Sequence, residues 1–211
     1  MAEIKPIETL YNGYRFRSRL EARWAVFFDT LGIRYLYEYE GYVGANGVGY
    51  LPDFFFPDYN IYVEVKGTDE ALRNDFGKII SAIEHDATPV SNGLVILGNI
   101  PLVDQNIPGN LPMFQLVKCK DGEVQLYHAT FWCEHDKPMF LTDIYMIKRY
   151  VLGMRIFKEL ENGKLPYFHV DFLRVGDLAC YRAVEEKLIR AYTSARQARF
   201  EFGDSQRIEV V

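Results

Sequence analysis

The stretch "YLPDFFFPDYNIYVEVKG" at residues 50–67 constrains the fold more than any other part of this 211-residue chain. Residues 50–56 and 61–66 are rich in aromatic and β-branched side chains, which is typical of β-strands. The four residues between them, "PDYN", include Pro, Asp and Asn, which favour tight turns. The stretch therefore predicts a β-hairpin.

Two acids interrupt this otherwise apolar hairpin. If the strands pair outward from the turn, Phe56 faces Ile61 and the register brings Asp53 opposite Glu64. Directly opposed residues on one sheet face have Cβ atoms about 5 Å apart. Carboxylates that close, among apolar neighbours, repel one another and lose hydration, so they need a proton or a cation. A divalent metal ion meets this need.

The residue types around the two acids suit magnesium or manganese. Mg²⁺ prefers oxygen ligands and keeps several waters, so a small protein ligand set suffices. We expect Asp53, Glu64 and the main-chain carbonyl of Val65 to supply it. Lys66 lies two residues beyond Glu64, so both side chains project from one face of the strand. Its ammonium is then placed to contact a phosphate or the attacking water.

A further carboxylate stands in the first predicted helix. Glu21 falls on the same stripe as Leu20, Trp24 and Phe28, which is an unusual position for an acid. A helix packed on the sheet through this stripe directs Glu21 towards the hairpin. We therefore expect Glu21 to supply a fourth group at the metal.

The rest of the pattern predicts the α/β class. The expected elements are helices at 14–32 and 68–85, strands at 33–41 and 93–98, a hairpin at 113–132 around Asp121-Gly122, and helical segments near 140–160 and 177–200. The first hundred residues then follow the order α-β-β-β-α-β, which predicts a mixed central sheet flanked by helices. We expect a core at 1–103, a β-hairpin insertion at 104–137 and a helical C-terminal region at 138–211.

Each candidate residue has an ordinary structural explanation when taken alone. Asp53 after a proline suits a strand end, and Glu64 with Lys66 suits a solvent-facing pair. Glu21 suits a helix acid bonded to a neighbouring arginine. The conjunction is what favours function: a helix Glu, then Pro-Asp at a strand, then Glu-x-Lys on the partner strand.

These residues resemble the signature of the PD-(D/E)xK nuclease superfamily, which has the restriction-endonuclease-like fold. The signature stands here as Pro52-Asp53 followed, after ten residues, by Glu64-Val65-Lys66. The stretch around it also looks like small nucleases encoded by phages and prophages, in which an early helix carries an Arg-Ser-x-x-Glu element, here 17–21. The resemblance covers roughly residues 11–100 and covers 100–211 poorly.

The resemblance implies Mg²⁺- or Mn²⁺-dependent hydrolysis of phosphodiester bonds. Asp53 and Glu64 would bind the metal, Lys66 would orient or activate the water, and Glu21 would assist. The expected protein is a DNA endonuclease of phage or mobile-element origin. Two alternatives stay open: a nuclease-fold module that binds nucleic acid or a protein partner without efficient catalysis, and the same chemistry on RNA.

Charge places limits on how nucleic acid is bound. A net charge of −5 argues against coating nucleic acid through bulk positive charge. Local concentrations of arginine suggest a defined groove instead. The residues expected to contact nucleic acid are Arg17, Ser18 and Arg19 in the first helix and Arg196 and Arg199 in the last.

Three further expectations concern zinc binding, cellular location and oligomeric state. Cys119, His128, Cys133 and His135 invite a zinc site, but their spacing lacks paired knuckles, so zinc is disfavoured. The odd number of cysteines and the absence of an apolar leader or long apolar run indicate a cytoplasmic protein with no membrane contact, in the host cytoplasm if phage-encoded. Other enzymes of this fold commonly dimerise, so a homodimer is expected by analogy.

Overall fold

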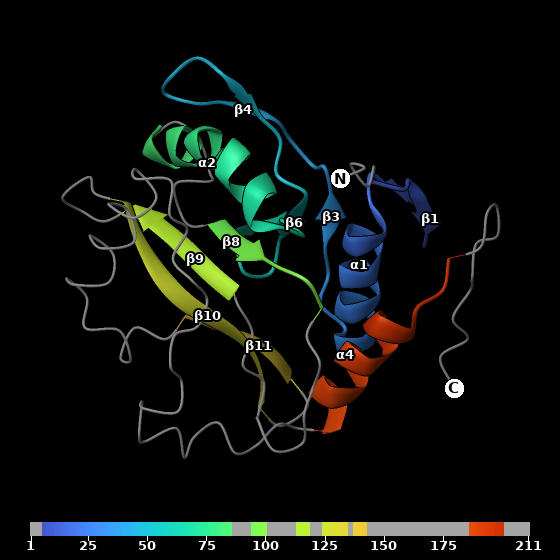
Figure 1. The fold of residues 1–211 in the computed structure, drawn as a ribbon. Coiled ribbons are helices and arrows are strands. Elements are labelled where there is room, and N and C mark those ends of the chain that lie inside the picture. The colour runs from blue at the N-terminus through green and yellow to red at the C-terminus, as the bar shows by residue number, and fades with distance from the viewer. Residues whose placement is uncertain are drawn as a thin grey trace.

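The structure is a computed structural model that describes residues 6–85, 94–100, 113–118, 124–134, 137–142 and 186–200. It is of the mixed α/β class, as the sequence predicts, with helices packed on a central sheet (Figure 1). Among the described residues, no helix combines the length and apolar character that crossing a membrane requires.

The central sheet has seven strands in the order β11-β10-β9-β8-β7-β6-β3. Their bounds are Leu36–Tyr37 (β3), Phe54–Phe56 (β6), Ile61–Val65 (β7), Leu94–Leu97 (β8), Met113–Lys118 (β9), Val124–Glu134 (β10) and Lys137–Thr142 (β11). Among the strands in the described residues, only β7 and β8 pair in parallel. Parallel neighbours need a crossover connection, and α2 (Asp69–Glu84) lies between them in the chain.

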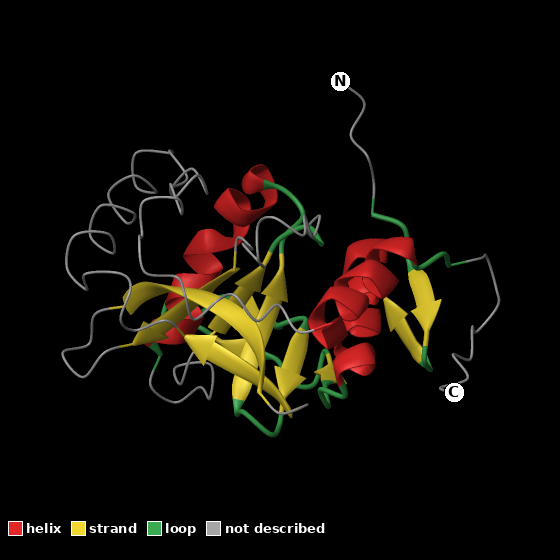
Figure 2. Cartoon of the chain, turned by 90° about the horizontal axis from the view of Figure 1, so that it is seen from below, coloured by secondary structure: helices red, strands yellow, loops and turns green. Residues whose placement is uncertain are grey.

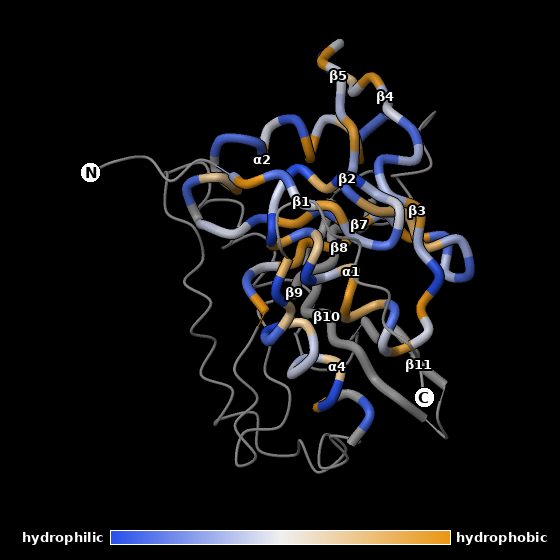
Figure 3. The backbone as a smooth tube through the Cα atoms, turned by 90° about the vertical axis from the view of Figure 1, so that its right-hand side faces the viewer, coloured by the Kyte–Doolittle hydropathy of each residue, from blue (hydrophilic) through white to orange (hydrophobic). Residues whose placement is uncertain are grey.

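Alternation along β6 and β7 divides the core into two layers. Phe54 and Val63 belong to the cluster that includes α1 (Arg19–Leu31) and α4 (Glu186–Gln197). Phe55 and Tyr62 face the other cluster, which includes α2. The sheet therefore lies between helices on both faces (Figure 2). Along α2, hydrophobic residues recur among hydrophilic ones, as in an amphipathic helix (Figure 3).

The first helix begins later than its hydrophobic pattern suggests. Ser18 is its N-cap, and Gly32 ends it in the left-handed conformation with φ 73°. Upstream lies a small hairpin, β1 (Thr9–Tyr11) and β2 (Tyr14–Phe16). Its turn is Asn12-Gly13 with φ of 46° and 82°, and Asn-Gly is a strong hairpin signal. The predicted helical start at residue 14 is therefore wrong.

The connection between β3 and β6 also differs from the prediction. The predicted strand at 33–41 is only two residues long as β3, and the glycine-rich residues 44–48 form the tip of a two-stranded ribbon. This ribbon consists of β4 (Tyr42–Val43) and β5 (Gly49–Tyr50). It is fixed to α2 because the Ala45 and Asn46 amides donate to the main chain and side chain of Ser81.

The distal strands extend the same sheet. The predicted hairpin forms as β9 and β10, and β9 pairs with β8 of the core. The prediction of helix after Pro138 is wrong for residues 137–142, which form β11. Pro138 is tolerated there because β11 is an edge strand, where a missing N–H breaks no ladder on its outer side. The domain boundaries at 103 and 137 stay predictions.

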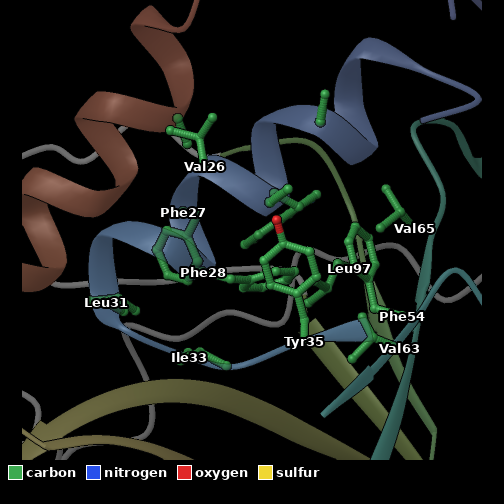
Figure 4. Close-up of a cluster of buried hydrophobic side chains, with 14 of the residues drawn as sticks. Val26, Phe27, Phe28, Leu31, Ile33, Tyr35, Phe54, Val63, Val65 and Leu97 are labelled. Carbon is green, nitrogen blue, oxygen red and sulfur yellow. The ribbon is translucent and has the colours of Figure 1, made fainter. Parts of the chain in front are cut away.

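Aromatic packing holds α1 between the sheet and α4. The Phe28 ring meets Phe54 and Phe56 edge-on, with ring centroids 5.2 and 4.8 Å apart. On the other side, Tyr192 of α4 stacks on Phe27 at 4.4 Å. Figure 4 shows Phe27, Phe28 and Leu31 along α1 on one side of the cluster and Phe54 of the sheet on the other. These rings fix the helix that carries Glu21.

We expect Phe28→Ala to lower the free energy of unfolding by about 3–5 kcal/mol, because it empties a fully buried ring site between helix and sheet. Urea denaturation followed by circular dichroism measures the change. The exposed Val43→Ala is the control and should stay within about 0.5 kcal/mol of the parent. A loss below about 1 kcal/mol for Phe28→Ala would contradict this packing.

Candidate functional site

The hairpin brings Asp53 and Glu64 together as predicted by the register. Phe56 pairs with Ile61 and Phe54 with Val63, so Asp53, one residue before β6, lies opposite Glu64. Both side chains are buried, with relative exposures of 3% and 4%. The Val65 amide donates to Asp53 Oδ2 at 2.7 Å and fixes that carboxylate against β7.

Glu21 joins this cluster from the start of α1. Its carboxylate accepts from the Ser18 hydroxyl at 2.7 Å, from the Arg17 amide at 3.0 Å and from the Tyr37 hydroxyl at 2.7 Å. Ser18 Oγ in turn accepts from the Glu21 amide, so the two residues form a reciprocal N-terminal cap. Glu21 lies near enough to the hairpin for its charge to raise the pKa of the Asp53 carboxyl, and its role at a metal stays a prediction.

Arg17 occupies a different place from the one a phosphate-binding residue needs. Its Nη2 lies 2.8 Å from Asp53 Oδ1, and its Nε lies 2.6 Å from Glu38 Oε1. The guanidinium therefore bridges two carboxylates of the chain itself. The side chain is still 55% exposed, so it can move away from Asp53 without unpacking the core.

Lys66 is held between two acids. Its ammonium lies 2.7 Å from Glu64 Oε1 and 2.6 Å from Asp75 Oδ2, and Lys78 also contacts Asp75 at 3.1 Å. Burial alone would lower the pKa of Lys66, but Glu64 and Asp75 raise it to about 12. The pKa of Asp75 is lowered despite partial burial because both lysines stabilise its charge. Lys66 is a stable cation at neutral pH.

Sequence reasoning missed two residues of the cluster. Tyr50 of β5 donates its hydroxyl to Glu64 Oε2 at 2.8 Å, and no motif marks it. Asp75 had a usable signal, because it lies three residues after Leu72 and four before Ile79, within the apolar stripe of α2. An acid in an apolar stripe is the same signal that identified Glu21.

Burial raises the pKa values of both central acids, and repulsion by neighbouring carboxylates adds to the rise for Asp53. For Asp53, burial raises the pKa most, followed by the charges of Glu64 and Glu21, while the Val65 amide and Arg17 oppose the rise. For Glu64, burial raises the pKa, and Lys66, Tyr50 and Arg17 oppose it. The cluster therefore has a high affinity for a proton or another positive charge.

The donor set suits a hard dication, although the four carboxylate oxygens of Asp53 and Glu64 already have one donor each. In the described part of the chain, no three His, Cys, Asp or Glu side chains are arranged to hold a metal ion. Two carboxylates plus waters are nevertheless a usual set for Mg²⁺. Metal binding here requires Arg17 to give way at Asp53 Oδ1, and Glu21 to be released from its cap if it is to join.

Comparisons find no relative for this chain: no family model, curated protein or solved structure matches it. The interpretation of the site therefore rests on its own residues.

Of the other residues predicted to contact nucleic acid, only Ser18 bonds a member of the cluster within the described residues, through Glu21. Ser18 serves as the N-cap of α1, and Arg19 is exposed beside it. Arg196, in the last turn of α4, and Arg199 are exposed. Within the described residues, neither forms an ion pair or hydrogen bond with Asp53 or Glu64. Their role stays a prediction.

The zinc alternative concerns side chains that lie outside the described part of the structure. Cys119 and His135 are not described, and only the backbone is described for His128 and Cys133.

We expect Asp53→Asn to raise the melting temperature of the metal-free protein at pH 7 by several degrees. The raised pKa means that Asp53 favours folding while protonated, below its ordinary pKa of 3.8, and that this contribution is lost as the pH rises through the folded value. Asn is neutral throughout, so its advantage should shrink as the pH falls towards 4.

Differential scanning calorimetry in EDTA from pH 4 to 8 measures this effect. Asp58→Asn is the matched control, because Asp58 is exposed and pairs only with the exposed Arg34; it should change the melting temperature little. A fall of several degrees for Asp53→Asn at pH 7 would show that the two acids do not repel as described.

Proposed function

We propose that this protein is a metal-dependent endonuclease that hydrolyses phosphodiester bonds in DNA and belongs to the PD-(D/E)xK nucleases. The observation that carries the proposal is the buried, in-register pair Asp53 and Glu64 with the Lys66 ammonium on Glu64. An ion pair that only stabilises the fold needs a single acid beside the lysine. Two opposed buried acids beside a lysine suit the binding of a dication and a phosphate.

The element order supports the finer fold assignment. Along the chain, α1 is followed by β3, β6 and β7, which form an antiparallel meander, and then by α2 and the parallel strand β8. This is the α-β-β-β-α-β order of the proposed nuclease core, with the β4–β5 ribbon inserted before β6. The site lies where the ends of β6 and β7 meet the N-terminus of α1.

Asp53, Glu64 and the Val65 carbonyl are the proposed ligands of Mg²⁺ or Mn²⁺, and Glu21 would hold a metal-bound water or a second ion. When bound, such an ion lowers the pKa of water and neutralises charge on the phosphate. Because Lys66 is a stable cation, its role is to orient the water and stabilise negative charge on the phosphate rather than to remove a proton.

Tyr50 and Asp75 are proposed to position this machinery. The Tyr50 hydroxyl fixes one oxygen of Glu64, and Asp75 holds Lys66 from the opposite side. Because each comes from a different element, the ribbon and α2 are both coupled to the site. DNA is the proposed substrate, by resemblance to phage nucleases, and RNA is the alternative. A homodimer would allow both strands to be cut.

A second candidate function is a nuclease-fold module that binds nucleic acid or a protein partner. The observation that favours it is internal charge balance, since Arg17 and Lys66 already pair with the two acids. Such a network is stable without a metal. A module of this kind would bind DNA equally well with and without Mg²⁺.

We expect Asp53→Asn, Glu64→Gln and Lys66→Ala each to lower the rate of DNA cleavage about 100-fold or more, because each removes a ligand or a charge at the phosphate. Plasmid, single-stranded and branched DNA, incubated with Mg²⁺, Mn²⁺ or EDTA, provide the assay. Lys78→Ala is the matched control for Lys66→Ala, since Lys78 also pairs with Asp75 but does not contact Glu64.

Cleavage that survives in one of these variants would remove that residue from the mechanism. If the parent cuts none of the substrates, and Lys66→Ala binds DNA as the parent does, the binding-module alternative holds.

We expect Arg17→Gln to tighten Mn²⁺ binding about fivefold, because it removes ~1 kcal/mol of ion pairing that competes for Asp53. Isothermal titration calorimetry measures the dissociation constant. Arg15→Gln is the matched control, because Arg15 is exposed and pairs with Glu8. Weaker Mn²⁺ binding by Arg17→Gln would contradict competition at Asp53.

A further inference from the structure

A strained residue joins the carboxylate cluster to an exposed aromatic ring. Glu38 follows β3 with φ 45°, a left-handed conformation that costs free energy for a residue with a Cβ. Two contacts maintain it: the Glu38 amide donates to the Asp53 carbonyl at 2.9 Å, and its carboxylate pairs with Arg17. This backbone turn ends the strand and places Tyr39 beside Phe55.

Tyr39 is the outermost ring of an aromatic column. Its ring is nearly parallel to that of Phe55, with an interplanar angle of 18° and centroids 5.3 Å apart, and the residue is 55% exposed. Phe55 in turn stacks on Tyr62 at 4.6 Å and 28°. Tyr42 meets Tyr62 edge-on at 5.5 Å, and the two hydroxyls are hydrogen-bonded. The column holds the Tyr39 ring in a fixed orientation.

This column stands next to the two acids. Phe55 and Tyr62 are a cross-strand pair on the same sheet face as Asp53 and Glu64, two residues further along each strand. Two strand residues span about 7 Å. That separation from the acids to Phe55 is about one extended nucleotide along a single strand, and Tyr39 stacks on the Phe55 ring, so a base next to a phosphate at the acids would be directed towards Tyr39.

The charges around Tyr39 favour contact with an uncharged nucleobase over contact with a backbone phosphate. Glu38 and Glu40 flank it; Glu38 is neutralised by Arg17, and Glu40 accepts a hydrogen bond from Tyr42. Residues 39–51 contain no Lys or Arg. This segment offers a backbone phosphate no cation of its own, and the nearby Arg17 is already paired with Glu38 and Asp53. An uncharged base face, by contrast, stacks on an aromatic ring irrespective of its sequence.

We propose that Tyr39 is a stacking platform for an unpaired nucleobase adjacent to the phosphate held at Asp53 and Glu64. This inference rests on the proposed nuclease function and specifies its substrate class: single-stranded, frayed or branched DNA. In a fully paired duplex both faces of each base are covered by neighbours, so the ring has no base face to contact.

The test is binding of a fluorescent 12-nucleotide oligodeoxyadenylate with one 2-aminopurine, compared with the matching duplex, in Ca²⁺ in place of Mg²⁺. We expect Tyr39→Ala to weaken single-strand binding about 10-fold and to leave duplex binding within about twofold. Tyr39→Phe keeps the ring and should preserve both the affinity and the quenching of 2-aminopurine that stacking causes. Thermal melting verifies that each variant is folded.

Leu51→Ala is the matched control, because Leu51 is another exposed apolar residue of the 39–51 segment. Four results would overturn the platform: unchanged binding by Tyr39→Ala, equal loss for duplex and single strand, an equal effect of Leu51→Ala, or no binding of any oligonucleotide. A concentration-dependent dimer that Tyr39→Ala abolishes would assign the ring to self-association and would also overturn it.

The two proposals fail separately. A parent protein that cuts DNA, with Tyr39→Ala cutting and binding single strands equally well, overturns the platform and leaves the nuclease. A parent protein that cuts nothing but binds single strands through Tyr39 overturns the nuclease and leaves the platform.

Discussion

Two carboxylates, Asp53 and Glu64, are buried opposite each other, and the surrounding structure compensates for that cost. Desolvation disfavours both charges, and the charge of Glu64 further disfavours that of Asp53. The four donors that offset the cost come from three separate elements or their ends: the Val65 amide and the Lys66 ammonium at the end of β7, Tyr50 in β5, and Arg17 before α1. The pair can stay together only while all these elements are in place, so the site depends on the whole core.

The same strand that presents the acids also anchors them. Phe54 and Phe56 point into the layer beneath α1, where Phe28 meets both rings, while Phe55 packs against the cluster on the α2 side. Asp53, just before these rings, contacts Arg17 and the Val65 amide. Because side chains alternate between the two sheet faces along residues 54–56, one short strand connects the rigid aromatic core with the exposed ring stack, and the polar site lies at its start. The strain at Glu38 is located where these two surface features meet, which is consistent with functional sites tolerating strained backbone.

Local patterns predicted the parts of the structure that local chemistry determines. The turn at 57–60 fixed the register of Asp53 and Glu64, and the apolar stripe of the first helix revealed Glu21. Asn12-Gly13 is also a recognisable hairpin signal. The helical periodicity of the residues that follow led instead to a predicted helix from residue 14. Tyr50 was not predictable, because only packing of the β4–β5 ribbon on α2 brings it to Glu64.

Arg17 shows the limit of motif reasoning at the site itself. Its position before Glu21 suggested a phosphate contact, yet the folded chain pairs it with Asp53 and Glu38. No sequence pattern reveals which partner a long cation selects when several acids converge from distant elements. In the same way, the residue pattern of β11 is compatible with a helix. It did not reveal that these residues pair as a strand with β10.

The most direct test is anomalous diffraction from crystals soaked in Mn²⁺. The account predicts a manganese peak between the carboxylates of residues 53 and 64, with the neighbouring guanidinium withdrawn from the first of them. Density in which that ion pair persists, with no peak beside it at millimolar Mn²⁺, would contradict a metal-dependent centre.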